Sequence, residues 1–157
     1  MNQDPRDAME LAQTAKLRFE TTELAVQKYG LDLERVSALG DQILEGVHRS
    51  DQQENVLWVL EVALAMITAV MAVNQEPLPV SKQVDPASYA MSVLRDMATD
   101  AAVRGMDWTA LETVSAEVLR KADETGHSNA EAYWALNRAT AQLELAWARD
   151  MIAREKD

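Results

Sequence analysis

The sequence predicts an all-α protein: a single-domain bundle of about six helices, with a largely apolar central third helix and a long C-terminal helix. Three observations support this. Apolar residues recur every three or four positions through six segments, only 5 Gly and 4 Pro interrupt 157 residues, and 48% of the residues are hydrophobic. A chain of this length can bury a core of its own, and this composition is typical of globular rather than disordered proteins.

The first two helices are predicted at residues 5–29 and 32–48. Asp4 and Pro5 form a typical start, because aspartate caps a helix and proline fits its first position. An apolar stripe then runs to Tyr29, and Gly30 is placed to end the helix in a left-handed conformation. The second helix ends at a polar break before Ser50.

The third helix, predicted at residues 52–74 with Ser50 or Asp51 as its cap, is apolar nearly all round. This pattern indicates a helix buried on most sides, at the centre of a bundle. Its stretch from Val56 to Val73 approaches the length of a bilayer crossing, but it is rich in alanine and carries Glu61 one turn inside its start. We therefore expect it to be covered by neighbouring helices, with no membrane association.

A proline-rich connection at residues 75–86 separates the first three helices from the last three. Each half is too short to supply much core alone, so residues 1–157 are interpreted as one domain. The fourth helix is predicted at residues 86–104. The fifth, at residues 108–125, is capped by Asp107 and carries Glu117 and Lys121 at the spacing of a stabilising ion pair.

The last helix is predicted at residues 129–155, with Ser128 and Glu131 as a capping box. Its apolar residues cover more of the circumference than one face requires, and its length of about 40 Å exceeds what a domain of this size needs. We interpret the excess as a partner or dimer surface. The alternative is that these side chains only pack on the bundle. The residues assigned to the interface are Tyr133, Trp134, Leu143, Trp147 and Met151.

The net charge of −11 disfavours binding to nucleic acid or to anionic membranes as the main activity. The absence of cysteine excludes disulfides, thiolate metal sites and cysteine nucleophiles. The first residues are polar and acidic, without the apolar segment of a secretory signal, so a cytoplasmic location is expected.

Both histidines, His48 and His127, follow a glutamate by three residues. Glu-x-x-His pairs on two helices, together with a Glu on each of two others, hold the metals of di-iron bundles. Glu20 or Glu23 and Glu61 could supply those further carboxylates. The alternative is that each imidazole lies at a helix C-terminus, where a positive charge complements the helix dipole.

A second set of carboxylates, Glu20, Glu23, Asp41 and Glu45, could meet across the first two helices and hold magnesium. This set is similar to the Glu-x-x-Glu arrangement of all-helical nucleotide pyrophosphohydrolases of the MazG type. The resemblance covers about 26 residues of the chain. Where that family carries Glu-x-x-Asp on its next helix, this sequence has Asp41-x-x-x-Glu45. The alternative is two solvated acidic faces.

Glu61 is the only charged residue between Val56 and Val73. A buried lone carboxylate is costly, so it is expected to pair with a cation or to take up a proton. Arg18, Arg95 and Arg138 are the candidate partners.

Three functions follow from these patterns. The first is a non-enzymatic acidic interaction or regulatory protein that binds a protein partner and forms a homodimer through its C-terminal helix, without a cofactor. The second is a metal-dependent enzyme or metal-binding protein that uses one of the carboxylate sets with Mg or Fe/Mn. The third is an acidic mimic of nucleic acid that occupies a DNA- or RNA-binding protein.

Overall fold

Six α-helices follow one another in the chain, as the sequence predicts. The computed structural model describes residues 5–50, 55–79 and 84–155. The helices are α1 (Pro5–Lys28), α2 (Leu33–His48), α3 (Val56–Val73), α4 (Pro86–Val103), α5 (Trp108–Glu124) and α6 (Asn129–Glu155). The predicted ends are confirmed to within one residue except at the start of α3, where residues 51–54 lie outside the described part of the chain.

The helix ends follow the local sequence signals. The side chains of Asp32, Asp85 and Asp107 each accept a hydrogen bond from a backbone N–H in the first turn of α2, α4 and α5. Gly126 ends α5 with a φ of +80°, a conformation that side-chain-bearing residues rarely adopt. These ends were predictable because every interacting group lies within a few residues along the chain.

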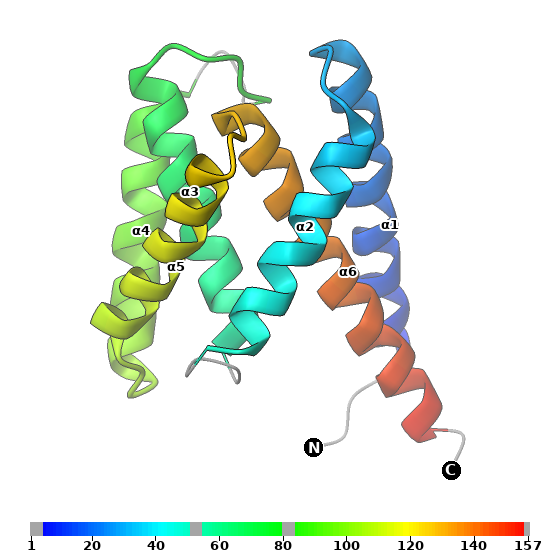
Figure 1. The fold of residues 1–157 in the computed structure, drawn as a ribbon. Coiled ribbons are helices and arrows are strands. Elements are labelled where there is room, and N and C mark those ends of the chain that lie inside the picture. Colours follow the sequence, from blue (N-terminus) through cyan, green and yellow to red (C-terminus); the bar gives the residue numbers. More distant parts are fainter. Residues whose placement is uncertain (1–4, 51–54, 80–83, 156–157) are drawn as a thin grey trace.

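The long C-terminal helix connects the two halves of the bundle. It packs against α1, α2 and α3, while α3 packs in turn against α4, α5 and α6. Figure 1 shows α1, α2 and α6 on one side of the molecule and α3, α4 and α5 on the other. The core between them contains, among other residues, Val36, Leu60, Met71, Leu111 and Leu136, all of which are fully buried.

α2 and α6 approach each other closely at Gly40. A Cβ atom at this position would lie 3.2 Å from the backbone oxygen of Ala135 on α6. The distance between the two helices therefore favours glycine here, because a larger residue would push α2 and α6 apart, although glycine lowers the intrinsic stability of α2. Asp41, the next residue, accepts a hydrogen bond of 3.1 Å from Gln142 on α6.

The apolar third helix is only partly covered by its neighbours. By length and composition alone, α3 could span a membrane. Half of its residues are buried inside the protein, however, and the core helix of a bundle can have the same length and composition. The buried Ser115 of α5 hydrogen-bonds to the backbone oxygen of Val59 at 3.1 Å. Val70, Val73 and Glu61 remain exposed.

Candidate functional site

The five residues of the predicted interface fall into two groups. Trp134 and Leu143 are buried among the chain's own helices and contribute almost no accessible surface. Tyr133 is partly buried, and its ring meets that of Trp134 edge to face with 4.8 Å between the centroids. Burial raises the pKa of the Tyr133 phenol. Trp147 is 40% exposed, and Met151 is partly exposed.

This division explains the wide apolar circumference of α6. Because α6 contacts α1, α2 and α3, three of its faces need apolar or closely packed side chains. The surplus in the sequence is thus largely used within the chain. The last stretch, residues 147–154, is less completely covered: Trp147 and Ile152 are exposed there, although Ala148 is fully buried. We call this stretch the α6 end.

The six residues considered for metal binding are not brought together. Glu20, Glu23, Asp41, Glu45, His48 and Glu61 are all exposed. Asp41 lies 3.7 Å from the guanidinium of Arg138, and Glu45 forms an ion pair with Arg49 one turn away. Within the described residues, no three His, Asp or Glu side chains are grouped so that they could hold a metal ion.

Arg18, one of the three candidate partners of Glu61, interacts with it electrostatically, although the described residues include no ion pair with Glu61. Arg18 of α1 forms an ion pair with Glu144 of α6, with 2.8 Å between Nε and Oε1, and it also interacts electrostatically with Glu61 of α3. We call these three residues the Arg18 cluster. Although Glu61 is exposed, the surrounding protein partly desolvates its carboxylate and raises its pKa, an effect that Arg18 opposes and Glu144 reinforces. Burial likewise raises the pKa of Glu144.

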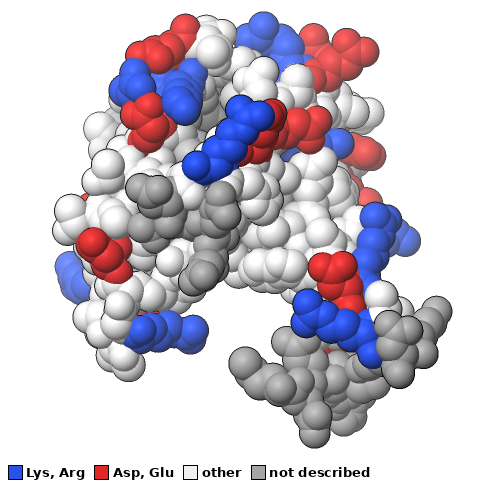
Figure 2. Space-filling model, turned by 60° about the horizontal axis from the view of Figure 1, so that its bottom comes forward, with Lys and Arg blue, Asp and Glu red and all other residues white. Residues whose placement is uncertain are grey.

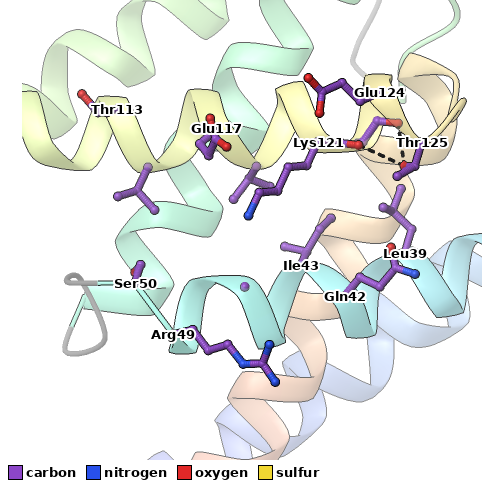
Figure 3. Close-up of a pocket in the computed structure, with 14 residues that line it drawn as sticks. Leu39, Gln42, Ile43, Arg49, Ser50, Thr113, Glu117, Lys121, Glu124 and Thr125 are labelled. Carbon is purple, nitrogen blue, oxygen red and sulfur yellow. Dashed lines mark hydrogen bonds between the residues drawn. The ribbon is translucent and has the colours of Figure 1, made fainter.

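A groove that the sequence did not predict lies between α2 and α5. Its volume is about 640 Å³. Leu39 and Ile43 of α2 and Val114 and Val118 of α5 form its apolar walls, and Gly46 lies on its α2 side. We refer to it as the α2–α5 groove, and Figure 3 shows the two helices facing each other across it.

Some of the charged residues around the groove form ion pairs and others do not. Glu117 and Glu124 both form ion pairs with Arg120, with 2.8 Å between Arg120 Nε and Glu117 Oε2. This pairing lowers the pKa of Glu117. The expected partner of Glu117 was Lys121, but a residue three positions away shares the same helix face and is bound instead. In Figure 3 the Lys121 side chain extends between the two helices, whereas Arg49 points away from the groove.

The groove had only a weak signal in the sequence. Gly46 lies in the last turn of α2, which ends at His48, and nothing in the spacing shows that α5 would lie opposite. In the structure a Cβ atom at Gly46 would meet no heavy atom within 4 Å, so packing does not require glycine there.

The chain matches no protein-family model, and it shows no significant match to a curated protein or to a solved structure.

Proposed function

We propose that this protein is a non-enzymatic helical interaction protein that self-associates through the α6 end. The observation that carries the proposal is the exposure of Trp147 at 40%. A tryptophan left this accessible removes a large apolar area from water when a partner covers it, and aromatic side chains are enriched at protein interfaces.

The position of Trp147 on α6 supports this reading. Leu136, Leu143 and Trp147 follow one another at spacings of seven and four residues, which places them on one stripe of the helix. Leu136 and Leu143 are buried in the core, whereas Trp147 on the same stripe is 40% exposed. An α6 of 27 residues is about 40 Å long, whereas α3, with 18, is about 27 Å long.

The charges of the α6 end also fit a second copy of the helix. Arg149, Asp150 and Arg154 give the α6 end both signs of charge. A second copy in antiparallel orientation can therefore align opposite charges around a shared apolar stripe, as the symmetry of a dimer requires.

The other two functions receive less support. The carboxylates that a metal-dependent enzyme would use lie exposed on separate elements, several of them beside arginines. On the face in Figure 2, basic side chains lie next to acidic ones rather than leaving a continuous acidic stripe. A mimic of nucleic acid needs such a stripe to imitate a row of phosphates.

The mass of the protein in solution tests the proposal. Sedimentation equilibrium over a wide concentration range is expected to show a dimer for the unmodified chain and a monomer for Trp147→Gln. Leu24→Gln is the matched control, because Leu24 is an exposed apolar residue of α1 outside the α6 end. A monomer at every concentration, or a dimer that survives Trp147→Gln, would contradict the proposal.

A further inference from the structure

We propose that the α2–α5 groove binds a small amphipathic carboxylate, with its apolar chain between the two helices and its head group on Lys121. This binding site is distinct from the α6 end and does not depend on self-association. The argument rests on the size of the groove, on an unusual glycine and on one cation.

The size and lining of the groove suit a small molecule. Its volume of about 640 Å³ lies within the range typical of ligand pockets, which are mostly apolar with a few polar groups at the edge. The α2 residues that line it run from Leu39 to Gly46, a span of about 10 Å along the helix, and Arg49 and Ser50 continue the lining beyond the helix end. An extended aliphatic chain fits a slot of this length.

Gly46 is the second observation. Glycine inside a helix costs about 1 kcal/mol relative to alanine, so it usually has a packing reason. At Gly40 that reason is the 3.2 Å approach to Ala135, but at Gly46 a Cβ atom would have no heavy atom within 4 Å. The missing side chain at Gly46 leaves the groove open, because any longer side chain there would occupy space that the apolar walls leave empty.

Lys121 decides the chemistry of the ligand. Both glutamates on the α5 rim are bound by Arg120, and Arg49 is bound by Glu45. Lys121 forms no ion pair with a described residue, although its charge contributes to the lowered pKa of Glu117. Figure 3 shows its side chain reaching between the helices. A cation at the edge of an apolar slot favours a ligand with one anionic group and a hydrophobic body over a neutral or cationic one.

Calorimetric titration of the full chain with decanoate, below the concentration at which decanoate forms micelles, tests the site. Decanol is the neutral probe of the same chain length, and it is expected to bind more weakly. Lys121→Gln is expected to weaken decanoate binding about tenfold and to leave decanol unaffected. The matched control is Lys16→Gln, which removes an exposed lysine from α1 and is expected to leave the affinity unchanged.

Gly46→Leu tests the cavity itself. The leucine side chain fills the groove, so decanoate binding is expected to be lost, while circular dichroism and thermal unfolding report whether the fold is intact. Amide chemical-shift changes on decanoate binding are expected in α2 and α5. The proposal is overturned if decanoate does not bind, if Gly46→Leu or Lys121→Gln binds it as tightly as the unmodified chain, or if the shifts occur at the α6 end instead.

Discussion

Arg18 of α1 and Glu144 of α6 form an ion pair, with 2.8 Å between Nε and Oε1. The positive charge of Arg18 also acts on Glu61 of α3 and lowers its pKa, against the effect of burial. One guanidinium thus interacts with two carboxylates from two other helices. Arg18 also donates a hydrogen bond of 3.4 Å to Asn137. The ion pair and the hydrogen bond therefore link α1 to α6.

Replacing Arg18 is expected to destabilise the protein. Arg18→Gln leaves Glu61 and Glu144 close together without a cation, which costs about 1–2 kcal/mol for a partly exposed group. The free energy of unfolding in urea at neutral pH measures the loss. Arg95→Gln, which removes an exposed arginine of α4, is the control and is expected to change stability by less than about 0.5 kcal/mol. Equal effects of the two variants would argue against the cluster.

The Arg18 cluster is expected to favour folding at mildly acidic pH. The pKa values of Glu61 and Glu144 are raised in the folded protein, so the folded state binds protons more readily than the unfolded chain. Stability from these two groups therefore increases as the pH falls from neutral toward the unfolded pKa of about 4.5.

Glu61→Gln tests this pH dependence. The free energy of unfolding at neutral pH is expected to be unchanged or higher, because the substitution removes a desolvated charge that Glu144 repels. The slope of the unfolding free energy against pH is expected to become flatter between about pH 5 and pH 7. Unfolding free energies measured across this interval check both parts. A steeper slope, or a loss of more than about 1 kcal/mol at neutral pH, would contradict the assignment.

The opposite pH dependence is expected for Glu131, at the start of α6. Arg35 Nε lies 2.8 Å from its carboxylate, and the Ser128 backbone N–H donates to it at 3.0 Å. These contacts hold the pKa of Glu131 below its usual range. Its contribution is therefore present above the unfolded pKa of about 4.5 and lost as the pH falls through the folded value.

Glu131→Gln removes this contribution. The variant is expected to lose about 1–2 kcal/mol at neutral pH and to become less sensitive to acid, because both the capping box and the contact with α2 depend on the carboxylate. Acid unfolding followed by circular dichroism measures the change. Glu23→Gln, at an exposed position on α1, serves as the control and should behave like the unmodified chain. An unaltered acid transition in Glu131→Gln would refute the assignment.

The sequence was most informative about interactions between nearby residues. The capping box of Ser128 and Glu131 and the cap at Asp107 involve groups within a few positions, so spacing predicted them. Spacing could not decide which helix faces which. Glu20 and Glu45 share no site because α1 and α2 both pack on α6 rather than on each other. The α2–α5 groove forms from two helices separated in the chain by α3 and α4.

The α6 stripe shows the same limit. The periodicity of α6 predicted that more than one face would be covered, but not that its own chain would provide most of the cover. Trp134 and Trp147 look alike in the sequence, and only the packing of α1, α2 and α3 makes the first buried and the second 40% exposed. Whether a residue is buried depends on where the neighbouring helices end, and the sequence of one helix does not contain this information.

The two glycines of α2 provide a matched test of that packing. Gly40→Ala places a Cβ atom 3.2 Å from the Ala135 backbone oxygen, so α2 and α6 must separate slightly. The strain is expected to cancel the gain in helix propensity or exceed it. Gly46→Ala meets nothing within 4 Å and is expected to stabilise the protein by about 0.5–1 kcal/mol. The unfolding free energies of the two variants in urea should therefore differ by at least about 0.5–1 kcal/mol. If both substitutions stabilise the protein equally, the close approach of α2 to α6 does not determine the residue at position 40. Gly40 and Gly46 would then not differ in their packing.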